Sequence, residues 1–167
     1  MYYDVGRMRP DEPQEQEILY AESVSLEPWL KALILVILAL YFVLFILMVI
    51  KSNVALSLAM GVLLALVIFL QWNFSRLSFE ITEKEVRFGF GIFMKKYPRE
   101  MVISCEPYTL KFSNYLGYGI RFGFDGTIAY NTRMGPGVKL TVEGEKRAFV
   151  LSINGVERAC EILSRSR

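Results

Sequence analysis

The chain contains two apolar runs of equal length: ALILVILALYFVLFILMVI (residues 32–50) and VALSLAMGVLLALVIFLQW (54–72). Only KSN (51–53) separates them. Neither run contains a charged residue or shows the polar face that a helix of a soluble bundle needs. At about 1.5 Å of rise per residue, each run forms a helix of roughly 28 Å, close to the ~30 Å of a bilayer's hydrocarbon core. The sequence therefore predicts an antiparallel hairpin of two membrane-spanning helices.

The residues that flank the two runs indicate an orientation. Trp29 and Lys31 lie at the start of the first run, and Trp72 and Arg76 at the end of the second, so all four are expected to anchor the hairpin at one membrane surface. The opposite turn offers only Lys51. This difference favours an integral protein of the cell membrane with both termini in the cytoplasm. Two cysteines without cystine-like spacing also fit a reducing compartment.

The charges divide the rest of the chain into two parts of opposite sign. Residues 1–27 carry seven Asp and Glu against two Arg, whereas residues 73–167 carry fifteen Lys and Arg against ten Asp and Glu. Prolines among the first acids predict partial disorder there. Residues 17–26, EILYAESVSL, are expected to add an edge strand to the C-terminal part. We therefore divide the chain into an acidic segment (1–27), the hairpin (28–73) and a C-terminal domain (74–167).

Beyond the hairpin, apolar and polar residues alternate instead of recurring at helical spacing. Seven such stretches, separated by turn residues, are typical of a small antiparallel sandwich or barrel. They are residues 76–82, 85–94, 101–108, 118–125, 127–133, 137–143 and 147–153.

The period changes in the last residues, NGVERACEILSRSR (154–167). Val156, Ala159, Cys160 and Leu163 fall at i, i+3, i+4 and i+7, which places them on one face of a helix. Ser152 or Asn154 is expected to cap the start of this helix. Seven antiparallel strands closed by one amphipathic helix is the order of elements in the pleckstrin-homology (PH) fold.

Several motifs in this region resemble a known family. Residues 117–163, GYGIRFGFDGTIAYNTRMGPGVKLTVEGEKRAFVLSINGVERACEIL, contain a G-x-G-I-R stretch, an aromatic–Asn pair, a glycine-flanked V-x-L strand and a final helix, in that order. This order resembles the end of bacterial and archaeal PH-like (bPH) domains. EILYAESVSLEPWLKALIL (17–35), the hairpin and RLSFEITEKEVRF (76–88) are similar to the layout of their membrane-anchored members. The resemblance implies a two-span membrane protein with a PH-like domain and no catalytic activity.

The composition argues against most catalytic chemistry. Histidine is absent, which removes Ser–His and Cys–His catalysis and most zinc sites. Cys105 and Cys160 are expected to pack as small apolar side chains rather than to pair or to bind metal. The paired acids lie at predicted turns, outside any pocket that would shift their pKa values, and ten acids interrupt the basic surface that nucleic acid would require. We expect no enzyme activity, no cofactor or metal, no nucleic acid and no small-molecule substrate.

Basic residues cluster in FMKKYPRE (93–100), at a predicted loop after the second strand. Beside an anionic leaflet, Lys95, Lys96 and Arg99 would each gain roughly 1 kcal/mol. Contact with anionic lipid headgroups is one interpretation of this cluster, and an ordinary solvated loop is the other.

The segment NYLGYGIRFGFDGTIAYNTRMGPG (114–137) is rich in glycine, but its G-x-G-x-x-x-G spacing and the strand after it do not match a dinucleotide-binding loop. Alternation predicts one face of the strand as core, formed by Tyr118, Ile120, Phe122 and Phe124. The opposite face is stripped of side chains by two glycines and is expected to accept another backbone, from the N-terminal segment or a protein partner. Its residues are Gly119, Arg121 and Gly123, with Arg133 on the neighbouring strand.

Three functions are compatible with these patterns. The favoured one is a non-catalytic, membrane-tethered interaction module that binds a protein partner or a second copy of itself. The alternatives are recognition of anionic lipid headgroups through the basic loop, and a structural subunit of a larger membrane complex. In the last case, the small residues Ser57, Ala59 and Gly61 would allow another span to approach closely.

Overall fold

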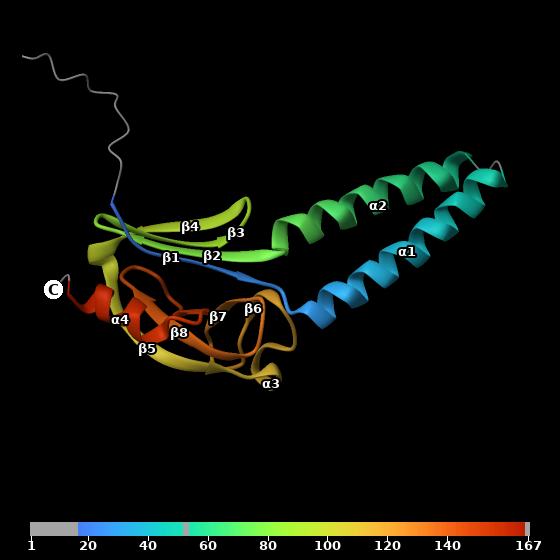
Figure 1. Ribbon diagram of the computed structural model, residues 1–167. Helices are drawn as coiled ribbons and strands as arrows, with labels where there is room; N and C mark the ends of the chain where they lie inside the picture. The colour runs from blue at the N-terminus through green and yellow to red at the C-terminus, as the bar shows by residue number, and fades with distance from the viewer. Residues whose placement is uncertain (1–16, 52–53, 166–167) are drawn as a thin grey trace, which may run out of the picture.

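The computed structural model describes residues 17–51 and 54–165, and the predicted disorder near the start of the chain falls outside this range. Two long helices project from a β-domain (Figure 1). Helix α1 spans Pro28–Ile50 and helix α2 spans Val54–Phe74, and both are long and apolar enough to cross a membrane. The two predicted helices are thus confirmed. α1 begins earlier than predicted, at Pro28, because proline is favoured in a first turn, where its missing N–H needs no partner.

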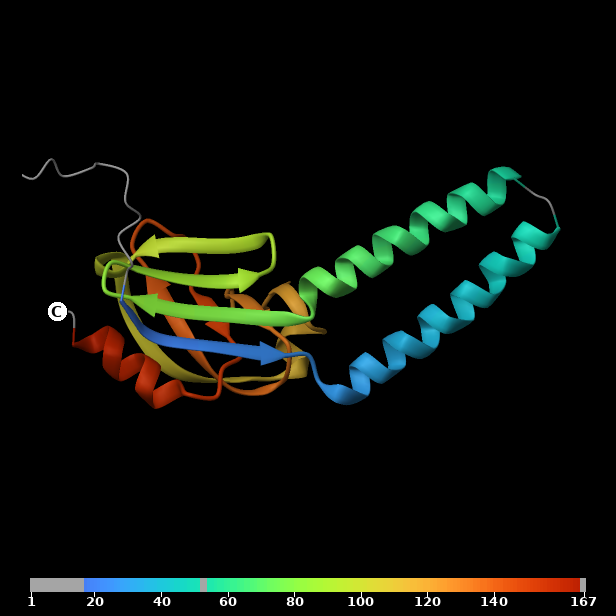
Figure 2. The ribbon, with the colours of Figure 1, turned by 45° about the horizontal axis from the view of Figure 1, so that its top comes forward.

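The two helices contact each other along part of their length and diverge toward the β-domain (Figures 1 and 2). The Tyr41 hydroxyl of α1 donates a hydrogen bond to the Met60 carbonyl oxygen of α2, at 3.1 Å. Gly61 faces the ring of Phe45, whose nearest carbon would lie 3.5 Å from an added Cβ. Gly61 therefore contributes to packing within the hairpin, where a larger side chain would meet the Phe45 ring.

The first sheet is an antiparallel meander whose strand order is β1-β2-β3-β4. Its strands are β1 (Ile18–Ser25), β2 (Arg76–Thr82), β3 (Glu85–Phe90) and β4 (Phe93–Pro98). The pairing of β1 with β2 confirms the predicted edge strand. The β-domain is consequently built from chain on both sides of the hairpin.

The second sheet has the order β5-β8-β9-β7-β6. Its strands are β5 (Val102–Leu110), β6 (Gly119–Phe122), β7 (Ile128–Asn131), β8 (Gly135–Val142) and β9 (Phe149–Leu151). A 3₁₀ turn, η1 (Arg99–Met101), precedes β5, and a short helix, α3 (Phe112–Tyr115), follows it. The final helix, α4 (Val156–Ser164), packs against β5, β8 and β1.

The core lies between the two sheets and is rich in aromatic rings. Phe79, Phe88 and Phe149 are fully buried, and the Phe88 ring packs edge-on against Tyr130 at a centroid distance of 5.3 Å. The inward positions of β2 alternate, as its sequence predicts, and α4 adds Ala159 to the same core. Each fully buried large apolar side chain stabilises the fold by about 1.5–3 kcal/mol.

Two features of the predicted sandwich are wrong. After the hairpin the described residues form eight strands, β2 to β9, rather than the seven predicted there, and β7 and β9 run parallel. Residues 85–94, predicted as one strand, are β3, a turn and the start of β4. Gly91 allows the turn because its φ of +40° is one that other residues rarely adopt. Asn73 Oδ1 accepts a 2.9 Å hydrogen bond from the Ile92 N–H, and a Cβ added to Gly91 would lie 2.1 Å from that oxygen. This contact comes from the end of α2.

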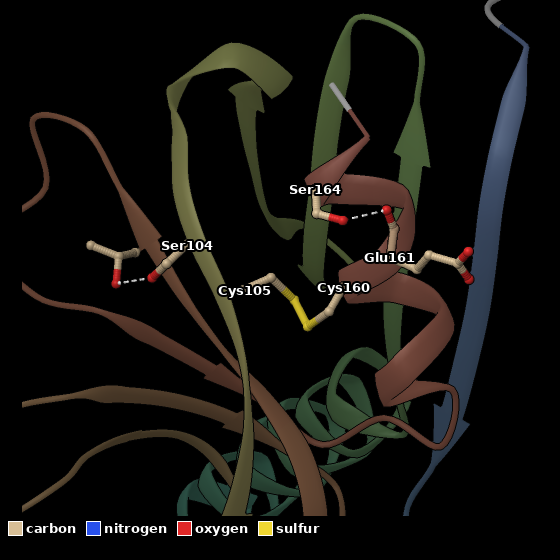
Figure 3. Close-up of a disulfide and its surroundings, with 6 residues drawn as sticks. Ser104, Cys105, Cys160, Glu161 and Ser164 are labelled. Carbon is tan, nitrogen blue, oxygen red and sulfur yellow. Dashed lines mark hydrogen bonds between the residues drawn. A yellow bond between two sulfur atoms is a disulfide. The ribbon is translucent and has the colours of Figure 1, made fainter. Parts of the chain in front are cut away.

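The prediction of unpaired cysteines is also wrong. Cys105 of β5 and Cys160 of α4 point toward each other and form a disulfide (Figure 3). Packing of α4 on β5 brings their Cα atoms to 5.2 Å, within the range that a disulfide requires. Their 55-residue separation gives no sign of this in the sequence. The cysteines therefore do not support a reducing compartment.

Candidate functional site

The basic residues predicted to form a loop lie instead on β4 and η1. Lys95 forms an ion pair with Glu145 at 3.1 Å and donates a hydrogen bond to the Tyr97 hydroxyl. Burial alone would lower the pKa of Lys95, but these two partners outweigh burial and raise it. Arg99 donates a hydrogen bond to the Ile162 carbonyl oxygen of α4, whereas Lys96 is exposed. Only one of the three charged groups is therefore without a partner among the described residues.

These basic residues also lie away from the helices. Phe93, at the start of β4, stacks on Phe74 at the end of α2, with ring centroids 5.5 Å apart. From there β4 runs toward the opposite end of the β-domain (Figure 2). At about 3.3 Å per strand residue, Lys96 lies about 10 Å and Arg99 roughly 20 Å beyond Phe93.

The predicted bare face of β6 is occupied by side chains of the same chain. A Cβ added to Gly119 would lie 3.7 Å from the Phe74 ring, and one added to Gly123 would lie 2.6 Å from the Tyr115 ring. Arg133 is half-buried and donates a 3.2 Å hydrogen bond to the Ile153 carbonyl oxygen. Arg121, by contrast, is exposed at the edge of the sheet. Arg121 and Arg133 therefore differ in exposure and in hydrogen-bond partner. Gly123 is explained by intramolecular packing, and Gly119 by its φ of +93°, which other residues rarely adopt.

The predicted interface anchors lie together at the end of the hairpin that joins the β-domain. Trp29 and Lys31 belong to the first turn of α1, Trp72 belongs to the last turn of α2, and Arg76 begins β2. Trp29 and Trp72 are 56% and 73% exposed. The Trp29 ring also packs edge-on against Tyr118, at a centroid distance of 6.3 Å. All four residues thus lie at one end of the hairpin, and their role as membrane-interface anchors stays a prediction.

An aromatic patch that the sequence did not predict lies on α3 and around the β6–β7 turn. Its exposed fractions are 55% for Phe112, 60% for Leu116, 68% for Phe122 and 78% for Phe124. The prediction that Phe122 and Phe124 face the core is wrong. β6 ends at Phe122 and is the edge strand of its sheet, so Phe124 lies in the turn, while the Arg147 guanidinium lies over the Phe122 ring, 5.2 Å from its centroid.

A network of hydrogen bonds joins α3 to the β6–β7 turn, the two segments that bear much of the patch. Asn114 of α3 accepts a hydrogen bond from the Phe124 N–H with its carbonyl oxygen and one from the Asp125 N–H with its side chain, both at 3.2 Å. Asp125 also accepts hydrogen bonds from the Tyr108 hydroxyl, at 2.6 Å, and from Thr127. Burial alone would raise the pKa of Asp125, but these hydrogen bonds outweigh it and lower the pKa to about 2. The exposed rings are therefore carried by an ordered scaffold.

A second polar cluster connects β1 to α4. Glu22 accepts hydrogen bonds from the N–H groups of Asn154 and Gly155, at 2.8 and 3.1 Å, from the Asn154 amide and from the Tyr20 hydroxyl. Burial alone would raise the pKa of Glu22, but these donors lower it. Gly155 is the N-cap residue of α4 and no side chain caps the helix there, so the prediction that Ser152 or Asn154 caps it is wrong. Glu22 instead ties β1 to the turn that precedes α4. A contact between residues 132 positions apart in the sequence leaves no local signal.

Comparisons with known proteins do not identify the chain. No protein-family model, curated protein or solved structure matches it significantly, so the resemblance to bPH domains stays a prediction based on the motifs quoted above. Among the residues that the structure describes, no three His, Cys, Asp or Glu side chains come together in the arrangement of a metal site.

Proposed function

We propose that this chain is a non-catalytic, membrane-tethered interaction module of PH-like architecture that binds a protein partner or a second copy of itself. The observation that carries this proposal is the aromatic patch of Phe112, Leu116, Phe122 and Phe124. Exposed apolar groups on a rigid scaffold are typical of protein-binding surfaces. The adjacent β6 is an edge strand, whose free backbone groups are available to a strand from a partner.

The PH-like assignment is supported by two sheets that enclose one core and by a C-terminal helix packed against them. The added strand β1 and the parallel pairing of β7 with β9 are features of this chain beyond the predicted seven antiparallel strands.

The attachment of the β-domain to the helices supports a role as a fixed platform. β1 leads into α1 and α2 leads into β2 with at most two residues between them. The Leu26 N–H donates a 3.0 Å hydrogen bond to the Ser75 carbonyl oxygen, which continues the β1–β2 pairing to the base of the helices. Asn73 and Phe74 then fasten α2 to the β3–β4 turn. The domain consequently presents its patch at one orientation relative to the membrane.

The side of the membrane is a further part of the proposal. The flanking charges favour the cytoplasm by a small margin, whereas the Cys105–Cys160 disulfide favours an oxidising compartment. We place the β-domain in the oxidising compartment, because a disulfide contributes several kcal/mol to folding and the charge difference is small. In intact cells, a membrane-impermeant reductant followed by a membrane-impermeant maleimide should then label the wild type. Labelling only after lysis would place the domain in the cytoplasm.

The test of the interaction surface uses the full chain in a mild detergent. Wild-type protein should elute as an assembly larger than the monomer, or cross-link to a partner in the membrane. The double substitution Phe122→Ser with Phe124→Ser should abolish this association. The matched control, Ile18→Ser with Ile103→Ser, removes two exposed apolar side chains from other strands and should leave it unchanged. A monomeric, partner-free wild type, or an assembly that survives the Phe substitutions, would refute the proposal.

The two alternatives have less structural support. Recognition of lipid by Lys95, Lys96 and Arg99 would need these groups free and near the membrane, whereas two of them are bound and β4 leads away from α2. An accessory subunit would use small residues of α2 against other spans, but Gly61 already faces Phe45 of α1.

A further inference from the structure

The space between the helices forms an apolar groove next to the β-domain. One pocket, of about 360 Å³, lies between Leu30 of α1, Gln71 of α2 and Arg121 of β6. A second pocket, of about 330 Å³, continues between α1 and α2 as far as Leu38 and Val67. The two pockets share Ile34, Gln71 and Phe74, so they form one continuous groove.

The groove has the dimensions of a segment of an acyl chain. From Phe74 to Val67, α2 rises about 10 Å at ~1.5 Å per residue, and α1 rises a similar distance from Leu30 to Leu38. Its walls along the two helices are aliphatic and aromatic, with Gln71 as the polar exception among their lining residues. The divergence of α1 and α2 toward the β-domain opens this space (Figure 1).

The end of the groove at the β-domain carries a positive charge. Arg121 lines the first pocket, and its guanidinium makes one 3.0 Å hydrogen bond, from Nε to the Tyr118 carbonyl oxygen. No ion pair to Arg121 forms within residues 17–51 and 54–165. Its terminal N–H groups are therefore available to a phosphate, which a guanidinium binds with charge-assisted hydrogen bonds.

The positions of these groups agree with the layers of a membrane. The aliphatic walls belong to the two helices proposed to span the bilayer, while Arg121 lies at the level where Trp29 contacts Tyr118. Tryptophan and tyrosine prefer the headgroup layer. An apolar slot within the helices and a free guanidinium at the interface match the two ends of one phospholipid.

We infer that the groove binds one phospholipid, whose acyl chain lies between α1 and α2 and whose phosphate is held by Arg121. This inference rests on the proposed insertion of the hairpin in a membrane but is independent of the partner-binding patch. It also assigns lipid recognition to a residue that is separate from the basic residues of β4.

The test uses full-length protein purified from membranes in a mild detergent, with bound lipid counted by native mass spectrometry. Wild-type protein should retain one phospholipid. Ile34→Trp should fill the groove and reduce retention at least tenfold, whereas the control Leu35→Trp, at an outward position of the same helix that is 66% exposed, should not. Arg121→Gln should weaken binding about tenfold, the effect expected for loss of a charge-assisted hydrogen bond. The control Arg165→Gln, at the end of α4, should leave binding unchanged.

Added ligands identify the chemistry of the site. Phosphatidylglycerol and phosphatidylethanolamine should each raise the melting temperature of delipidated wild-type protein more than diacylglycerol, which lacks the phosphate, or inorganic phosphate, which lacks the chains. Equal stabilisation by diacylglycerol, equal loss in both Trp variants, or no effect of Arg121→Gln would overturn the inference. An Ile34→Trp variant that loses a dimer instead of a lipid would assign the groove to a second copy of the chain. Release of the protein from membranes by alkaline carbonate would instead refute membrane insertion, and with it the proposed tether.

Discussion

Removal of the Cys105–Cys160 disulfide should strongly destabilise the β-domain. The bond closes a loop of 55 residues that runs from β5 to α4. In the chain-entropy description, closing a loop of this length in the unfolded chain is worth about 4 kcal/mol. A helix as short as α4 is marginal by itself, so it depends on such tertiary constraints. We therefore expect Cys105→Ser, Cys160→Ser and the double variant each to lower the free energy of unfolding by about 4 kcal/mol.

The measurement is guanidinium denaturation of the full chain in a mild detergent, followed by near-ultraviolet circular dichroism of the aromatic core. The three variants should share one midpoint, because either single substitution already breaks the bond. A reductant should move the wild type to that midpoint and leave the double variant unchanged. A loss below about 1 kcal/mol, or a wild type that does not respond to reductant, would refute the claim that this bond holds α4 on β5.

Three further substitutions test the contacts that organise the domain, and a fourth serves as their control. Glu22→Gln should lower the free energy of unfolding by about 1 kcal/mol at pH 7, discounted for partial exposure. Because the folded state lowers the pKa of Glu22, the stabilisation by its carboxylate is present above the ordinary pKa of 4.5 and is lost as the pH falls through the lowered pKa. The free energy of unfolding should therefore fall less steeply with acid in the variant than in the wild type. Asn73→Ala should cost about 1–2 kcal/mol and speed amide exchange at Ile92, since it removes the acceptor at the β3–β4 turn; unchanged exchange would contradict that role. Phe88→Ala should cost about 3–5 kcal/mol in thermal unfolding because the ring is fully buried, whereas the exposed Phe124→Ala should cost under about 0.5 kcal/mol.

The parts of the fold that the sequence predicted are encoded by local pattern. A long apolar helix needs only an unbroken apolar run, so α1 and α2 were placed to within a few residues. Strand alternation likewise located β2 and β5, and helical spacing located α4. In each case the deciding residues lie within one element.

The parts that failed depend on contacts between distant elements. FGFGIF (residues 88–93) alternates without a break, and the turn inside it is set by Asn73, which the chain places at the end of α2. The alternation of residues distinguishes the two faces of β6, but it does not show that Phe122 is exposed to solvent because β6 is an edge strand. A cluster of basic residues does not show which of them are paired, and Glu145, the partner of Lys95, lies 50 residues further along the chain.

The position of β1 links folding of the β-domain to insertion of the hairpin. β1 pairs with β2 along nearly its whole length, yet the two helices separate these strands in the sequence. Under the proposed membrane insertion, β1 and β2 lie on the same side of the membrane only when both ends of the hairpin emerge there. If one helix then failed to insert, β1 would be held away from β2, and Glu22 could not bond the N–H groups of Asn154 and Gly155. The edge of the first sheet and the start of the last helix would then both lose their partners. In the proposed membrane protein, the completed domain, with its patch and the base of its groove, therefore requires both helices to insert as an antiparallel pair.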